Sequence, residues 1–148
     1  MNIETLFADL SANSNVTISI DVGNEAWTFG NVALQVGGDG RVMATLRFAG
    51  VAPRQFTANL DPIRVDSVGA YLLAHHFTTI RAPIKRRPKG DSVVRFRVYG
   101  DGATLMFESE LWESDRRESV DLDAILNYYE ALVAEISGGV LPYGQADP

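Results

Sequence analysis

Apolar and polar residues alternate along several stretches of the first sixty residues, which is typical of half-buried β-strands. The stretch "VTISIDV" (residues 16–22) has an apolar residue at every second position. The stretch "TFGNVALQV" (28–36) leads through "GGDG" to "RVMATLRF" (41–48), and "RQFTANL" (54–60) alternates again before "DP" closes it. These patterns predict four antiparallel strands.

A turn at residues 38–40, "GDG", fixes the pairing of the second and third strands. A three-residue hairpin loop with Gly40 in the left-handed conformation connects two antiparallel strands in a defined register. The apolar residues of both strands then meet on one face, so pattern and turn chemistry agree. The register predicts three opposed pairs: Val36 with Val42, Leu34 with Ala44, and Val32 with Leu46.

A second hairpin is predicted in "SVVRFRVYGDGATLMFESELW" (92–112), where residues 101–102, "DG", favour a two-residue turn. On the solvated face, opposed charges stabilise a sheet by about 0.2–1 kcal/mol per pair. We therefore expect the charges of Arg95 and Arg97 to be balanced by Glu108 and Glu110. The turn predicts these pairs: Val98 with Leu105, Phe96 with Phe107, and Arg95 with Glu108, to which Arg97 is diagonal.

A long amphipathic helix is predicted near the C-terminus, in "VDLDAILNYYEALVAEISGG" (120–139). Asp121 is the expected N-cap, Val120 and Ile125 occupy the two hydrophobic-staple positions, and residues 138–139, both glycine, end the helix. One apolar stripe is expected to face the sheet: Leu122, Ile125, Leu126, Tyr129, Leu132, Val133 and Ile136.

Two further helices are less regular in pattern. Ile3, Leu6, Phe7 and Leu10 have the spacing of a short N-terminal helix. Residues 66–77, "DSVGAYLLAHHF", fit either a helix capped by Asp66 or Ser67 or an extended strand. Gly69 is unfavourable inside a helix, but the apolar spacing favours the helix.

Together these elements predict one α+β domain over residues 1–148, in which an antiparallel sheet of about six strands packs one face against the N- and C-terminal helices. The chain has no cysteine, which excludes disulfides and thiolate chemistry, and no apolar run as long as a membrane span. Its N-terminus carries Glu4 and Asp9 but no basic residue, unlike a secretory signal peptide. We therefore expect a cytoplasmic protein without a membrane segment.

The distribution of charge is the best functional signal in this sequence. The net charge is −6, with 13 Lys and Arg against 19 Asp and Glu, yet seven of the basic residues lie within residues 81–97. Once Arg95 and Arg97 are assigned to the sheet, a basic loop remains as the candidate partner-binding site: Arg81, Lys85, Arg86, Arg87 and Lys89. The alternative is a solvated loop that protects strand edges.

Nucleic acid is a poorer fit to this loop than protein is. Nucleic-acid binding usually needs aromatic platforms or a reading helix as well, and residues 81–91 contain no aromatic residue. Residues 108–135 hold nine acidic residues against two arginines. A basic region and an acidic region on one domain suit a partner of mixed polarity or a self-complementary homodimer.

No catalytic, metal or cofactor site is expected. The only histidines, His75 and His76, are adjacent, and adjacent side chains diverge on either a helix or a strand. They are therefore expected to be poorly placed to share a metal ion or to act as an acid–base pair. The sequence also lacks the G-x-S-x-G, H-E-x-x-H and G-K-[ST] motifs.

The order of predicted elements is helix, three or four strands, helix, hairpin and long capped helix. This order resembles the type III secretion chaperone-like fold and its YbjN-like relatives. The most similar part is "VVRFRVYGDGATLMFESEL" followed by "VDLDAILNYYEALVAEI", about a third of the chain. The resemblance implies a non-catalytic protein that dimerises and holds a partner segment in extended form. The strand at 54–60 and the basic loop at 81–89 depart from that family, and no binding residue is carried over.

The sequence therefore predicts a non-enzymatic protein-binding module, such as a chaperone, an adaptor or an immunity-type inhibitor. A nucleic-acid or phosphate-ligand binder using residues 81–89 is the first alternative. The second is an enzyme or small-ligand binder with a pocket between sheet and helix, involving His75, Tyr71 or Trp112, because catalytic groups from distant strands leave no local motif.

Overall fold

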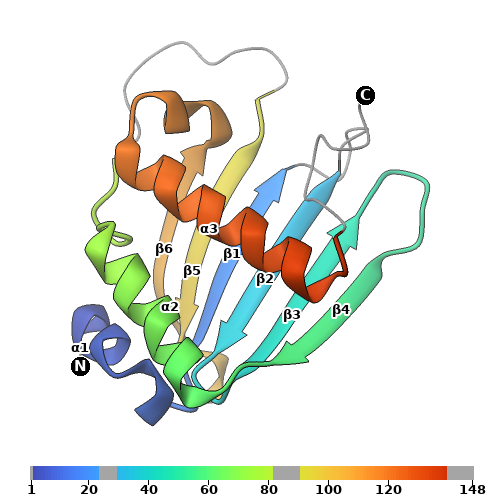
Figure 1. Ribbon diagram of the computed structural model, residues 1–148. Coiled ribbons are helices and arrows are strands. Elements are labelled where there is room, and N and C mark those ends of the chain that lie inside the picture. The colour runs from blue at the N-terminus through green and yellow to red at the C-terminus, as the bar shows by residue number, and fades with distance from the viewer. Residues whose placement is uncertain (1, 24–29, 82–90, 140–148) are drawn as a thin grey trace.

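The computed structural model describes residues 2–23, 30–81 and 91–139 (Figure 1). Along the chain the helices, strands and short 3₁₀ turns are α1 Ile3–Ala8, η1 Leu10–Ala12, β1 Thr17–Gly23, β2 Asn31–Gly37, β3 Arg41–Arg47, β4 Arg54–Asn59, α2 Pro62–Ala74, β5 Val93–Tyr99, η2 Asp101–Ala103, β6 Leu105–Trp112, η3 Glu113–Arg117 and α3 Val120–Ile136.

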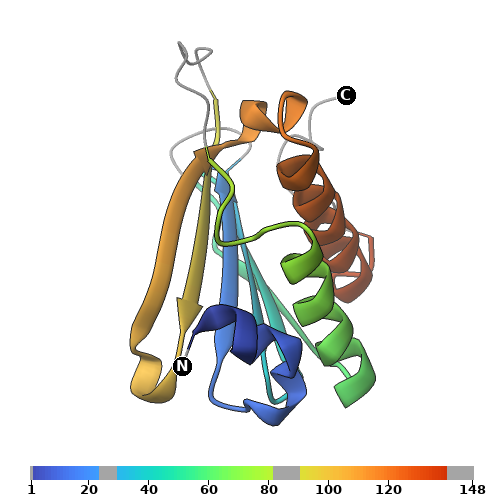
Figure 2. The same cartoon turned by 90° about the vertical axis from the view of Figure 1, so that its left-hand side faces the viewer.

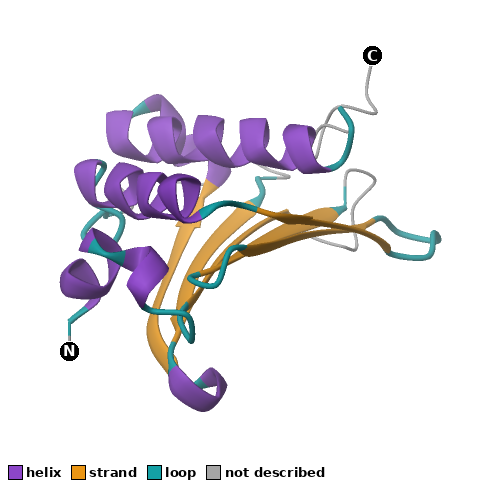
Figure 3. Cartoon of the chain, turned by 60° about the horizontal axis from the view of Figure 1, so that its bottom comes forward, coloured by secondary structure: helices purple, strands orange, loops and turns teal. Residues whose placement is uncertain are grey.

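The strands form one six-stranded antiparallel sheet in the order β4-β3-β2-β1-β5-β6. All three α-helices lie on the same face of this sheet, with α3 running across the strands and α2 beside it (Figures 1 and 2). No α-helix of the described ranges lies on the other face (Figure 3). The predicted α+β architecture is confirmed. None of the described helices combines the length and apolar content that crossing a bilayer requires.

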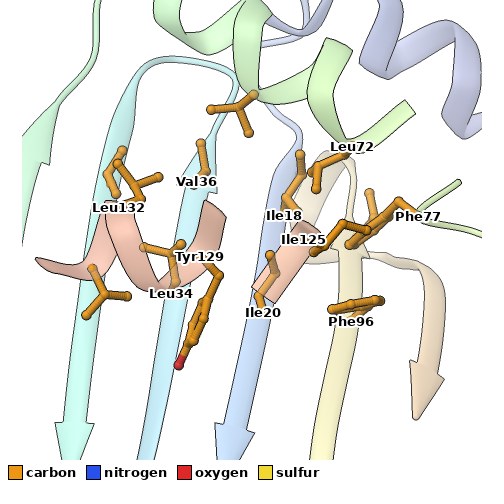
Figure 4. Close-up of a cluster of buried hydrophobic side chains, with 14 of the residues drawn as sticks. Ile18, Ile20, Leu34, Val36, Leu72, Phe77, Phe96, Ile125, Tyr129 and Leu132 are labelled. Atoms are coloured by element: carbon orange, nitrogen blue, oxygen red, sulfur yellow. The ribbon is translucent and has the colours of Figure 1, made fainter. Parts of the chain in front are cut away.

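The core fills the layer between the sheet and the helices (Figure 4). Alternate residues of the inner strands point toward α3, and every member of the predicted α3 stripe is buried except Ile136, which is partly buried. The buried Tyr129 of α3 donates a hydrogen bond of 2.8 Å from its hydroxyl to the Val32 carbonyl oxygen of β2. Phe77 stacks on Phe96 of β5 with ring centroids 4.6 Å apart.

The predicted β2–β3 hairpin is confirmed in register. Val36 pairs with Val42, Leu34 with Ala44, and Val32 with Leu46. Gly40 has a φ of 93°, the left-handed region that the three-residue turn requires.

The predicted register of the β5–β6 hairpin is wrong by two residues. Val98 pairs with Phe107 instead of Leu105, and Phe96 with Ser109 instead of Phe107. The turn is longer than two residues because Gly102 and Ala103 both adopt left-handed conformations, with φ of 63° and 59°. A bulge between Val98 and Tyr99 adds to the shift. A shift of two residues preserves the alternation of faces, so Phe107 and Leu111 still pack against the core, whereas Leu105, beyond the bulge, is 49% exposed.

Residues 66–77 include a helix, as expected, but α2 begins earlier than predicted. Asp61 is the N-cap, and its carboxylate accepts a hydrogen bond from the Arg64 backbone NH at 2.9 Å. Pro62 follows at the first helical position, where its missing NH costs no hydrogen bond. The "DP" pair that ends β4 is therefore also the start signal of α2.

The start of α3 also differs from the prediction. Ser119 is the N-cap, because its side chain accepts a hydrogen bond from the Leu122 backbone NH. Val120 is 83% exposed, so the predicted hydrophobic staple does not form. Asp121 lies within the first turn, and its carboxylate is available to other partners.

Candidate functional site

The sheet face opposite the helices carries the polar residues that alternate with the buried apolar residues along the strands. Its two halves differ in chemistry. The half formed by β5, β6 and the adjoining β1 is charged, and the half formed by β2, β3 and β4 is mostly uncharged. We call this whole surface the open face.

Charged residues form two rows across β1, β5 and β6. In one row Arg97 lies between Ser19 and Glu108, and its Nε donates a hydrogen bond of 2.6 Å to Glu108. In the other row Arg95 lies between Asp21 and Glu110, and its Nε is 3.2 Å from Glu110. The expectation that Glu108 and Glu110 balance both arginines is confirmed, although Arg95 lies opposite Glu110 instead of Glu108, and Arg97 lies directly opposite Glu108 instead of diagonal to it.

The hydrogen bond to Glu108 is also the largest cause that raises the pKa of Arg97, and partial burial opposes it. Asp21 contributes to the same rise and also accepts a hydrogen bond from the Asn31 side chain on β2. Each arginine is therefore paired with one glutamate of β6 and lies near Asp21, and a phosphate would have to displace a carboxylate to reach either one.

The uncharged half of the open face contains a hollow of about 560 Å³ near the β2–β3 turn. Its polar lining includes Thr17, Gln35, Thr57 and Asn59. Asp39 and Arg41 lie at its turn end, 3.8 Å apart. This surface offers side-chain hydrogen bonds without a strong net charge.

The candidate basic loop falls largely outside the described residues. Arg81 is described and is exposed after the end of α2. Lys85, Arg86, Arg87 and Lys89 lie in 82–90, outside the described ranges. A binding role for this loop therefore stays a prediction.

The side chains of the two histidines were expected to diverge, but they converge on one carboxylate. His75 Nδ1 is 3.2 Å from Asp121 Oδ1, and His76 Nδ1 is 3.0 Å from Asp121 Oδ2. The reason is the backbone: His75 ends α2, and His76 has a left-handed φ of 56°, so the two residues do not follow one helix or one strand. Within the described ranges no group of three or more His, Asp or Glu residues has the arrangement of a metal site.

This cluster is one end of a seam that joins the antiparallel helices α2 and α3. In its middle Tyr71 stacks on Tyr128 and contacts His75 with tilted rings, at centroid distances of 4.4 and 4.5 Å. Burial raises the pKa of the Tyr128 hydroxyl. The Tyr71 hydroxyl donates to the Ala124 carbonyl oxygen of α3 at 3.1 Å. The residues proposed for a pocket are thus used in helix packing at Tyr71 and His75, while Trp112 ends β6.

At the other end of the seam Arg64 forms a two-pronged ion pair with Glu135, at 2.5 and 2.9 Å. The Arg64 hydrogen bond lowers the pKa of Glu135. The pair is half-exposed, so its contribution to stability is small, about 0–1 kcal/mol. This ion pair therefore orients α2 against α3 more than it stabilises them.

The seam gives a pH-dependent prediction. Hydrogen bonds from His76 first, and then from His75, lower the pKa of Asp121 below its ordinary value of 3.8. A lowered carboxyl pKa contributes stability above the unfolded-state value, and this contribution is lost as the pH falls through the folded-state value. We expect Asp121→Asn to be less stable than wild type at pH 6, with a difference that shrinks below about pH 4. Urea unfolding at both pH values measures this.

The matched variant is His76→Asn, because asparagine tolerates the left-handed conformation at this position. In a double-mutant cycle the two changes should not be additive at pH 6. A pH-independent difference would show that the charge of Asp121 does not stabilise the fold, and full additivity would show that this charge acts through the dipole of α3 and not through His76.

The acidic region 108–135 contains a basic centre that the sequence analysis missed. Arg116 is 17% exposed, and its guanidinium lies 2.8 Å from Asp123, 2.9 Å from Glu130 and 3.5 Å from Glu113. Three of the nine acidic residues of this region therefore surround one arginine. The only signal in the sequence was the pair of arginines within an acidic stretch, which does not reveal that α3 folds back over η3.

No protein-family model matches this chain, and no curated protein sequence matches it significantly.

Proposed function

We propose that this chain is a non-enzymatic, cytoplasmic protein-binding module, a chaperone, adaptor or immunity-type inhibitor that works as a homodimer, and that its open face is the surface that meets the partner. The observation that carries the proposal is the pair of rows across β1, β5 and β6 in which Arg95 lies between Asp21 and Glu110, and Arg97 between Ser19 and Glu108. The element order typical of type III secretion chaperone-like proteins favours the same function.

The physical argument rests on charge and rigidity. Each arginine is fixed by its neighbours on a continuous sheet, so little side-chain entropy is lost when a partner covers it. Alternating signs complement a protein surface of mixed polarity and discriminate against wrong partners. A polyanion would instead be repelled by Glu108 and Glu110, both about half-exposed.

The test uses a charge swap that keeps the ion pair. Arg97→Glu combined with Glu108→Arg reverses one row while preserving a salt bridge at the same position, so the melting temperature should change little. We expect affinity for the partner to fall by about tenfold or more, measured by isothermal titration calorimetry. The partner is first identified by a pull-down of tagged protein from native lysate, with and without nuclease, read by mass spectrometry.

The comparison variant reverses the basic loop, Lys85→Glu, Arg86→Glu and Arg87→Glu. If this variant loses binding and the swap does not, the partner meets the loop and the open face is the wrong surface. Material that is captured only without nuclease would favour the nucleic-acid alternative, with its steep salt dependence. An empty pull-down would favour a small ligand or substrate, and metabolite screening would follow.

A further inference from the structure

The two edges of the sheet are protected to different degrees. Edge strands with free backbone groups pair with other chains unless bulges, charges or prolines prevent it. At one edge, β6 pairs with β5 through a bulge and carries Glu108 and Glu110. At the other edge, β4 pairs with β3 in six consecutive unbroken pairs, and its one charged residue is Arg54 at its start.

The backbone of β4 that faces away from β3 can be assigned from its register. The Leu60 backbone NH donates to the Gly40 carbonyl oxygen at 2.8 Å, so Leu60 bonds toward β3. Hydrogen-bonding direction alternates along an antiparallel strand. The NH and C=O groups of Gln55, Thr57 and Asn59 therefore point outward, where no described strand pairs with them.

We propose that β4 pairs antiparallel with β4 of a second copy of this chain, about a twofold axis at Thr57, so that the two six-stranded sheets become continuous. This proposal rests on the dimeric part of the proposed function and specifies its interface. With the axis at Thr57, this residue pairs with Thr57 of the second copy through the outward-pointing backbone groups of both. Opposed residues of antiparallel strands point to the same face, so the helices of both copies lie on one side of the joined sheet.

The side chains of β4 are self-complementary in this register. On the helix face the large Phe56 lies opposite the small Ala58 of the second copy. On the open face Gln55 lies opposite Asn59 of the second copy, and Thr57 opposite Thr57, pairs that form side-chain hydrogen bonds across strands. No like charges are opposed, because Arg54 meets the position of Leu60.

Two exposed apolar side chains flank β4 at equal distances from Thr57. Val51 is six residues before it and is 60% exposed, and Ile63 is six residues after it and is 78% exposed. In antiparallel pairing about Thr57, the start of β4 in one copy, with Val51 before it, lies beside the end of β4 in the other copy, with Ile63 after it. Their association would remove apolar surface from water at both ends of the paired strands.

Because one short strand buries less surface than the roughly 1,200 Å² of a standard interface, we expect a weak dimer with a micromolar dissociation constant. Sedimentation velocity from about 1 to 500 µM should show a concentration-dependent shift from monomer to dimer. Thr57→Lys and Thr57→Glu each place like charges face to face on the axis, and each should raise the dissociation constant about tenfold. An equimolar mixture of the two variants should regain wild-type association, because lysine then faces glutamate.

The matched control is Thr5→Lys, an exposed threonine on α1, which should associate as wild type does. Unchanged melting curves for all variants confirm that folding is intact. The proposal is overturned if wild type stays monomeric throughout, or if both Thr57 variants still associate. It is also overturned if mixing the variants restores nothing, since the axis then does not pass through Thr57. Loss of this dimer with retained partner binding would leave the open-face proposal standing, so the two failures are distinguishable.

Discussion

Phe77→Ala is expected to lower the free energy of unfolding by about 3–5 kcal/mol. Phe77 is 2% exposed and contacts three other rings, Phe7 of α1, Phe96 of β5 and Phe107 of β6, at centroid distances of 5.6, 4.6 and 5.9 Å. Its ring thus connects the N-terminal helix α1 with strands β5 and β6. Because these neighbours belong to separate elements that are fixed elsewhere, they cannot collapse into the cavity, and the cost should lie near the top of the range.

The matched variant is Phe107→Ala, which removes a half-buried ring at the margin of the same cluster. It should cost clearly less, because part of its surface is already in water. Urea unfolding measured by circular dichroism distinguishes the two. Equal losses, or a loss at Phe77 below about 1 kcal/mol, would mean that the cluster is loosely packed.

Period-two alternation was enough to predict the sheet and, at β2–β3, its register. The reason is that a slip of one residue would expose the whole apolar set of Val32, Leu34 and Val36. A slip of two residues carries no such cost, and this is the error made at β5–β6. There the register depends on whether Gly102 and Ala103 form a tight or a wide turn, which alternation cannot reveal.

Helix ends were predicted less well because several residues nearby are able to cap them. Asp61 caps α2 where Asp66 or Ser67 was expected, and Ser119 caps α3 where Asp121 was expected. Capping competition is local, but the outcome depends on where the preceding strand or turn ends. The second error concealed the carboxylate that holds both histidines.

In the candidate site, too, some features could be predicted from the sequence and others could not. The balance between β5 arginines and β6 glutamates could be predicted, because cross-strand neighbours follow from the hairpin. The seam and the Arg116 centre could not, because they depend on how α3 lies against α2 and η3, a tertiary arrangement with no short-range pattern. The loop containing Lys85, Arg86, Arg87 and Lys89 lies outside the described residues, and its role stays a prediction.

Gly69→Ala is expected to destabilise the protein by about 2–3 kcal/mol, although the same change in an isolated helix is stabilising by about 1 kcal/mol. A Cβ at Gly69 would lie 2.3 Å from the Phe7 carbonyl oxygen and 3.2 Å from the Leu10 Cβ. Backbone atoms cannot rotate away, so α1 would have to move off α2. The glycine that weakened the helix prediction is therefore what allows α1 to pack this closely against α2.

The control is Ser67→Ala on the exposed side of the same helix, where the serine hydroxyl donates to the Ile63 carbonyl oxygen at 3.0 Å. This change should alter stability by no more than about 0.5 kcal/mol. Amide hydrogen exchange adds a second measurement, because displacement of α1 should speed exchange in residues 6–10 in Gly69→Ala alone. If Gly69→Ala instead raised stability, helix propensity would outweigh the α1 contact. The N-terminal helix would then be only loosely held, and Phe7 could not be a fixed wall of the cavity argued for Phe77.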